Sequence, residues 1–183
     1  PSRNLGARIS QGELIFFLDG DDLFNREHIF ICLHQMVKDP NLHFVQTGIR
    51  IDEAISPYWK NAIANSVPFN ICVRRWCHEC IGGYPEGEEF LALRCEDAFY
   101  RVLLSRYFIG FKIKRETMQH FRYPGNALDR QMEKFSKPPT NEAQNEAMSA
   151  QELEAFPAIQ KLLTSKNLEL KQRLTSWLNQ LEQ

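Results

Sequence analysis

The stretch "GELIFFLDGDDLF", residues 12–24, joins an apolar run to a cluster of acids. Residues 14–18 are all aliphatic or aromatic, which predicts a short buried strand. Asp19, Asp21 and Asp22 follow this run directly. Carboxylates so close together repel one another, so the cluster is unfavourable unless a positive charge lies among them. The stretch therefore predicts a strand whose carboxyl end carries a charged site.

A divalent cation is the usual source of such a charge, because Mg²⁺ and Mn²⁺ prefer carboxylate and phosphate oxygens as ligands. Ligands of α/β proteins also bind at the carboxyl ends of strands. The cluster thus predicts a metal whose remaining positions take a phosphate group. A plainer interpretation is a solvated acidic turn that caps the next helix, a role that Asp22 or Asn25 could fill alone. The acids by themselves leave both interpretations open.

Length and composition describe an ordinary globular protein. The 183 residues suffice for one domain, or for one domain and a tail. A formal net charge of -1 provides no basic surface for nonspecific binding of nucleic acid. No apolar stretch approaches the ~20 residues that a membrane helix needs. We therefore expect the chain in the cytoplasm, or peripherally at the inner face of a membrane.

The cysteines lack the repeated spacing of a disulfide framework, which favours a reducing compartment. They are Cys32, Cys72, Cys77, Cys80 and Cys95. The pair in "CHEC", residues 77–80, has the local spacing of two zinc ligands, but no second pair accompanies it. Ordinary helix residues are therefore the favoured interpretation of this pair.

Apolar patterning predicts strands and helices in alternation, which is typical of a layered α/β fold. Strands are expected over residues 14–18, 42–51 and 69–73, with an extended segment over 110–121. Helices are expected over 25–38, with Asn25 as the cap, over 75–81 and over 97–107. The composition becomes polar from Lys137, and apolar residues return at helical spacing from Leu153. We therefore expect a domain over residues 1–136, followed by a linker and an amphipathic helical tail over 137–183.

Three blocks of the chain resemble the motifs of family 2 glycosyltransferases. The first is "RNLGARISQGELIFFLDGDD", with Asn4, Gly6, the pair Ala7-Arg8 and the pair Gly12-Glu13 at the family's motif positions. The second is "NICVRRWCHECIGGYPEG", and the third is "CEDAFYRVLL". They stand in the family's order and extend over residues 3–122. The resemblance implies a GT-A fold, a three-layer α/β/α domain, here without the first strands that bind the nucleoside.

The resemblance also assigns roles to residues within and near these blocks. It implies metal ligation by Asp19, Asp21, Asp22 and His120, and donor binding by Arg8, Asp19 and Asp21. It places the catalytic base at Asp97, supported by Glu96. Because Asp97 is expected at a helix N-terminus, the helix dipole predicts that it is ionised at neutral pH. The acceptor side is expected to include Gly82, Gly83, Tyr84 and Trp59.

These roles describe an inverting glycosyltransferase that depends on Mn²⁺ or Mg²⁺ and uses a nucleotide-sugar donor, with a UDP-sugar expected from its frequency in the family. The Gln-x-x-Arg-Trp motif of the processive synthases is absent, so transfer of one sugar to a carbohydrate or other hydroxyl acceptor is expected. The helical tail is a candidate for self-association. Two alternatives remain: an Asp-x-Asp phosphatase of the haloacid-dehalogenase type, with Asp19 as nucleophile, and a non-catalytic scaffold that keeps the fold.

Overall fold

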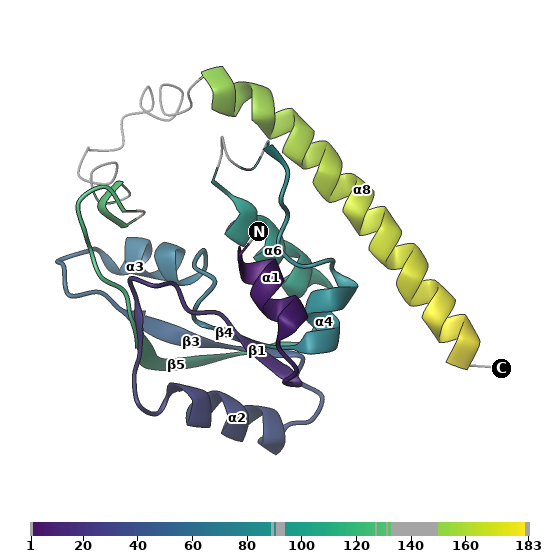
Figure 1. Cartoon of the computed structure of the whole chain (residues 1–183), viewed down its shortest axis with the longest axis horizontal. Coiled ribbons are helices and arrows are strands. Elements are labelled where there is room, and N and C mark those ends of the chain that lie inside the picture. Colours follow the sequence, from purple (N-terminus) through teal and green to yellow (C-terminus); the bar gives the residue numbers. More distant parts are fainter. Residues whose placement is uncertain are drawn as a thin grey trace.

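The computed structural model describes residues 2–88, 90, 94–126, 128–130, 132 and 150–181. Among these residues, five strands form one mixed sheet in the order β1-β4-β3-β5-β2 (Figure 1). The strands are β1 (Leu14–Phe16), β2 (Leu23–Phe24), β3 (Phe44–Arg50), β4 (Ile71–Arg74) and β5 (Gly110–Gln119). Strands β3 and β5 run parallel, whereas the other neighbours pair antiparallel.

Helices cover both faces of the sheet, which confirms the three-layer α/β/α arrangement. Helix α2 (His28–Lys38) lies on one face, and α1 (Ser2–Ile9), α4 (Arg75–Cys80) and α6 (Glu96–Tyr107) lie on the other (Figure 1). The remaining helices are α3 (Pro57–Ala64), which packs on one end of the sheet, and the long α8 (Ala150–Leu181).

The apolar run 14–18 begins with β1, and its alternate side chains serve two different cores. Ile15 and Phe17 pack with residues of α1, α4 and α6. Leu14 and Phe16 instead pack against the core beneath α2. A run that is apolar at every position is thus explained by burial of the strand on both faces. The final residue, Leu18, is exposed, so the chain leaves the core just before the acids.

Some local expectations were wrong. The helix expected from Asn25 begins at His28, and Asn25 does not cap it: its Nδ2 donates a hydrogen bond to the backbone oxygen of Glu116 instead. No helix was expected around Pro57, but this segment forms α3. Proline is tolerated at the first helical position because no hydrogen bond is lost there. Strand β2 was also not expected, because two residues are too short to show a sequence period.

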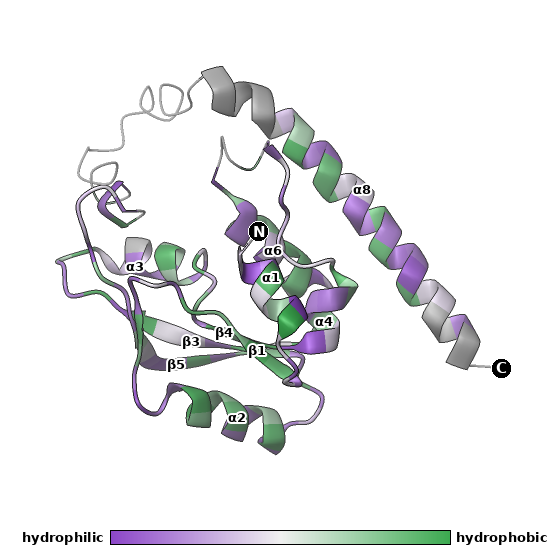
Figure 2. Ribbon diagram, in the orientation of Figure 1, coloured by the Kyte–Doolittle hydropathy of each residue, from purple (hydrophilic) through white to green (hydrophobic). Residues whose placement is uncertain are grey.

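The C-terminal helix α8 packs against the domain through α4 and α6. Leu170 is fully buried in the core shared with these helices. The Tyr107 hydroxyl donates to the backbone oxygen of Asn167 (3.0 Å), and Arg173 donates to the backbone oxygen of Cys80 (3.0 Å). Figure 2 shows apolar and polar residues interleaved along the coloured part of α8. The expected linker lies outside the described residues up to residue 149.

Candidate active site

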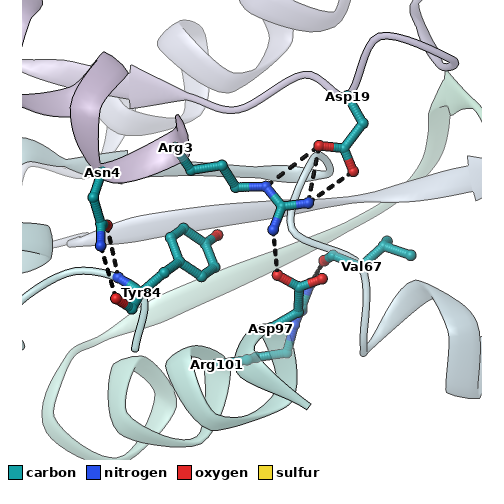
Figure 3. A network of polar contacts seen from close by, with 7 residues as sticks. All are labelled: Arg3, Asn4, Asp19, Val67, Tyr84, Asp97 and Arg101. Atoms are coloured by element: carbon teal, nitrogen blue, oxygen red, sulfur yellow. Dashed lines mark hydrogen bonds and ion pairs between the residues drawn. The ribbon is translucent and has the colours of Figure 1, made fainter. Parts of the chain in front are cut away.

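A single guanidinium group connects the two acidic motifs of the sequence. Arg3 Nη2 lies 2.9 Å from each carboxylate oxygen of Asp19, and its Nε lies 3.3 Å from Asp19 Oδ1. Arg3 Nη1 donates to Asp97 Oδ1 at 2.9 Å, so all three nitrogens are engaged (Figure 3). All three side chains are about one-quarter to one-third exposed, with values of 26%, 32% and 25%. The fold therefore brings the acid after β1 and the acid at the start of α6 to one place.

Helix α1 is held in this position by a turn on the other side of the site. Asn4 Nδ2 donates to the backbone oxygen of Tyr84 (2.8 Å), and the Tyr84 amide donates to Asn4 Oδ1 (2.9 Å). Gly82 and Gly83 precede this clamp with φ angles of 82° and 74°, a region that favours glycine. A Cβ on Gly83 would also stand 2.5 Å from Asn4 Oδ1. The Gly-Gly turn is thus required for the clamp that orients α1, and with it Arg3.

Tyr84 forms the floor of the site. Its ring stacks on Tyr100, with centroids 4.1 Å apart, and the Arg3 guanidinium lies 5.3 Å from the Tyr84 ring centroid. The Tyr84 hydroxyl is buried and has no hydrogen-bond partner among the described residues. Figure 3 shows this hydroxyl on the side of Arg3 and Asp97. Buried hydroxyls are normally paired, so an unpaired one at a charged site points to a ligand.

Asp97 holds its proton more tightly than the sequence suggested. Burial raises the pKa of its carboxyl group to about 7, against the opposing effect of the Arg3 charge, and the charges of Glu96 and Asp19 raise it further. The expectation that Asp97 is fully ionised at neutral pH, from the helix dipole, is therefore wrong. The dipole of α6 is a smaller effect than the loss of water and the two neighbouring carboxylates. Near neutrality this group can both take up and release a proton.

The other expected metal ligands do not converge on Asp19. Asp22 is buried and accepts a hydrogen bond from His120 Nδ1 at 2.6 Å, and a second, longer one from the Phe121 amide at 3.4 Å. Asp21 is exposed and makes no hydrogen bond or ion pair with a described residue. Within the described part of the chain, no three His, Cys, Asp or Glu side chains are grouped as metal ligands. As arranged, these residues do not fit a divalent cation, because Asp19 and Asp22 each have a basic partner.

The remaining predicted residues lie around this centre. Arg8 is exposed on the last turn of α1 and makes no ion pair with Asp19 or Asp97. Arg3, which was not expected in the site, pairs with both of these acids. Glu96 begins α6 beside Asp97. Trp59 belongs to α3, but its side chain lies outside the described residues. The signal for Arg3 was its place directly before Asn4 in the first motif.

The "CHEC" segment lies on helix α4, and Cys77, His78 and Cys80 are buried there. Cys77 and Cys80 are buried in the cluster beneath α4, and burial raises the pKa of the Cys77 thiol to about 12. His78 Nδ1 lies 3.0 Å from the Tyr100 hydroxyl, also inside the protein. All three side chains therefore contribute to packing under the active-site floor.

A groove beside the charged centre runs between α1 and the 12–20 segment. It has a volume of about 560 Å³, which is within the usual range for small-molecule sites. Arg3 and Asp19 line it, as do Gly6 and Gly12. A Cβ added at Gly6 would meet no atom within 4 Å, so the backbone of α1 is accessible there.

Comparison with known proteins found a family match for the first part of the chain. Residues 1–85 match the family model described as glycosyl transferase family 2, and this match includes Arg3, Asp19 and the Gly-Gly turn but ends before Asp97. The search of curated proteins found no match. None of the described helices combines the length and apolar character needed to span a membrane. The sheet with helices on both faces is consistent with part of a GT-A-like domain. Residues 1–85 of the chain are therefore similar to glycosyl transferase family 2.

Proposed function

We propose that the chain moves one sugar from a nucleotide-diphosphate sugar to a hydroxyl group of an acceptor, with inversion at the anomeric carbon. The observation that carries this proposal is the ion-paired chain Asp19–Arg3–Asp97. It brings an acid of the expected donor motif next to the expected base. The family match supports glycosyl transfer in general, and the details below are our proposal.

Asp97 is proposed as the general base. In a single displacement, the acceptor oxygen bonds to the anomeric carbon while its proton passes to the Asp97 carboxylate. The bond between the anomeric carbon and the diphosphate oxygen breaks at the same time, and the leaving diphosphate keeps the electron pair. A pKa of about 7 suits this task, because a general base works best when its pKa lies near the working pH.

The groove between α1 and the 12–20 segment is proposed as the donor side. Its volume of about 560 Å³ accommodates a ligand of nucleotide size. The positive charge of Arg3 at this groove favours an anionic diphosphate over a neutral sugar. A uridine nucleotide remains an expectation from the family, since the described side chains provide no reading of the base.

The acceptor is proposed to lie on the side of Tyr84. Its unpaired hydroxyl can donate to, or accept from, a sugar hydroxyl close to Asp97. The left-handed Gly82-Gly83 turn lets the backbone approach a ligand closely at the same border. This arrangement favours a hydroxyl-rich acceptor, and Trp59 stays a prediction for the same side.

Dependence on Mn²⁺ or Mg²⁺ also stays a prediction. Family 2 enzymes typically use a divalent metal, but Asp19 and Asp22 are paired with Arg3 and His120 here. For this reason the chemistry above is assigned to the chain's own residues.

The test is turnover of a panel of radiolabelled nucleotide sugars, with water or simple glycosides as acceptors. We expect release of the nucleoside diphosphate, and its loss by about a thousandfold in Asp97→Asn, in line with removal of a general base and its charge. Asp52→Asn is the matched control, because Asp52 is an exposed carboxylate paired with Arg50. Release of phosphate from p-nitrophenyl phosphate would favour the phosphatase alternative, and no turnover of any donor would favour the scaffold.

A further inference from the structure

A second guanidinium group lies beneath the proposed base. Arg101 follows Asp97 by four positions on α6, which is about one helical turn, or roughly 6 Å along the helix axis. Arg3 reaches Asp97 from the groove, whereas Arg101 is buried, with 8% of its surface exposed. Figure 3 shows the Arg101 side chain behind that of Asp97, with its end at Val67. The base thus has one arginine on the open side and one inside the protein.

The contacts of Arg101 leave its charge without a negative partner. Its Nη2 donates to the backbone oxygen of Val67 at 2.6 Å and to Asn70 Oδ1 at 2.8 Å, and both acceptors are neutral. Its Nε is buried and has no hydrogen-bond partner among the described residues. A buried cation of this kind is unfavourable unless a negative group lies nearby. Burial lowers the pKa of Arg101 to about 10, and the charge of Asp97 is one of the opposing effects.

Asn70 fixes the guanidinium of Arg101 in place. Asn70 is fully buried, and its Nδ2 donates to the backbone oxygens of Thr47 and Ala64, each at 2.8 Å. These two bonds orient the amide group so that its oxygen accepts from Arg101. The position of Arg101 is therefore set by strand β3 and by the end of α3, to which Asn70 is bound.

The two arginines differ in their exposure to a ligand. Arg3 lines the groove, is shared between Asp19 and Asp97, and is one-quarter exposed. An anionic diphosphate in the groove would compete with these acids for its charge. Arg101 is not among the residues that line the groove, and its surroundings do not include Asp19. Its charge therefore stays available to Asp97 when Arg3 is engaged by a ligand.

We propose that Arg101 is a positioning residue for the base: a fixed, buried positive charge that stabilises the ionised carboxylate of Asp97. The inference rests on the proposed function, which assigns the role of base to Asp97. Arg101 acts through this carboxylate rather than on the substrate. It differs in this from an arginine that only joins α6 to the sheet, because its effect depends on its charge.

The charged and titratable groups around Asp97 act in opposite directions. Burial raises the pKa of Asp97, and the charges of Glu96 and Asp19 raise it further, whereas those of Arg3 and Arg101 lower it. Tyr84 is the remaining titratable group that faces Asp97. Removal of the Arg101 charge should therefore raise the pKa of Asp97, opposite in sign to removal of the Glu96 charge.

The experiment follows the Asp97 carboxyl group directly, by NMR titration of the full chain labelled with ¹³C at the aspartate carboxyl carbons. Neither donor nor acceptor is present, and the signal is identified by its loss in Asp97→Asn. We expect the pKa of Asp97 to rise by about one unit in Arg101→Met, the lower end of the effect of a nearby opposite charge. Arg101→Lys keeps the charge, so the pKa should rise by less than about half a unit.

Arg106→Met is the matched control. Arg106 is exposed in the last turn of the same helix, and the substitution removes the same charge. It lies nine positions after Asp97, roughly 13 Å along the helix axis. This is more than the screening length of about 8 Å at physiological ionic strength, so the pKa of Asp97 should move by less than about 0.2 units. Circular dichroism and urea unfolding establish that each variant folds. Arg101→Gln, which also removes the charge but can still donate to Asn70, replaces Arg101→Met if that variant does not fold.

Transfer kinetics provide an independent measurement. In the neutral variants, the acid limb of kcat/KM should move to higher pH by the same amount, because the base acts when deprotonated. An unchanged pKa of Asp97 in a folded neutral variant would overturn the inference, as would an equal rise in Arg101→Lys or Arg106→Met. Such results would leave Arg101 with a structural role alone. The expected shift in the NMR titration, without sugar transfer by the wild type, would instead reject the proposed function and leave the interaction between Arg101 and Asp97 in place.

Discussion

Arg3 and Asp97 are 94 positions apart in the chain and form an ion pair of 2.9 Å in the site. The pair connects α1, which carries Arg3, to the first turn of α6, which carries Asp97 (Figure 3). Even so, burial raises the pKa of Asp97 to about 7 against the effect of the Arg3 charge, and the like charges of Glu96 and Asp19 raise it further. The pKa of Asp97 therefore depends on its burial and on the charges around it, so substitution of a neighbouring charged residue should shift it.

The first prediction concerns pH. Since a base must be deprotonated to act, kcat/KM should fall as the pH drops through about 7, the pKa of Asp97. Glu96 raises that pKa by its like charge, so Glu96→Gln should lower it and move the acid limb of the profile to lower pH. The measurement is kcat/KM for donor turnover between pH 5 and pH 9, roughly the range around one titration. A limb that stays in place in Glu96→Gln would show that another group governs the profile.

The second prediction concerns the Gly-Gly turn. Gly83→Ala should destabilise the protein by about 3 kcal/mol, combining the cost of a left-handed alanine with the displacement of Asn4. Gly125→Ala is the matched control, since Gly125 has a φ of 78° but no atom within 4 Å of a new Cβ. This variant should lose only the stability that a left-handed alanine backbone costs, about 1–2 kcal/mol. Urea unfolding of both variants gives the difference, and equal losses would mean that the Asn4 clamp contributes nothing.

The third prediction concerns the docking of α8. Leu170 is fully buried, so Leu170→Ala should cost about 2–5 kcal/mol in urea unfolding. Leu168→Ala, on the same helix but 60% exposed in the native protein, should cost less than about 1 kcal/mol. Similar small losses in both variants would show that α8 is not part of the cooperative unit. They would also support the boundary expected near residue 137.

The layered fold could be predicted from the sequence because its strands are marked by composition. The run 14–18 is apolar at every position, and the structure buries β1 from both sides, against α2 and against α4 with α6. The start of α2 was misplaced because Asn25 is a good cap by type, yet its side chain is used by the neighbouring strand β5. Residue type indicates local preference, and the tertiary contact decided the outcome.

The acidic residues of the site could be predicted from the sequence, but the residues that pair with them could not. Asp19 and Asp97 were selected from separate motifs, but no spacing in the sequence shows that Arg3 reaches both. Such a contact depends on how α1 folds back over the end of β1. The same holds for Asp22 and His120, expected as two ligands of one ion and found as a buried hydrogen-bonded pair. Pairing of charged residues that are far apart in the chain depends on the fold, whereas a sequence motif shows only residues that are close together.

The last prediction separates binding from stability with two stacked tyrosines. The Tyr84 hydroxyl is buried without a partner among the described residues, so Tyr84→Phe should leave the stability unchanged or raise it by about 1 kcal/mol. The Tyr100 hydroxyl is 3.0 Å from His78 Nδ1, so Tyr100→Phe should lower the stability by about 1 kcal/mol. If the Tyr84 hydroxyl meets the acceptor, Tyr84→Phe should also lower transfer about tenfold through KM or kcat. Urea unfolding and transfer kinetics on both variants test this. Because removal of an unpaired buried group relieves the fold, a Tyr84→Phe variant that is stable and fully active would place the acceptor elsewhere.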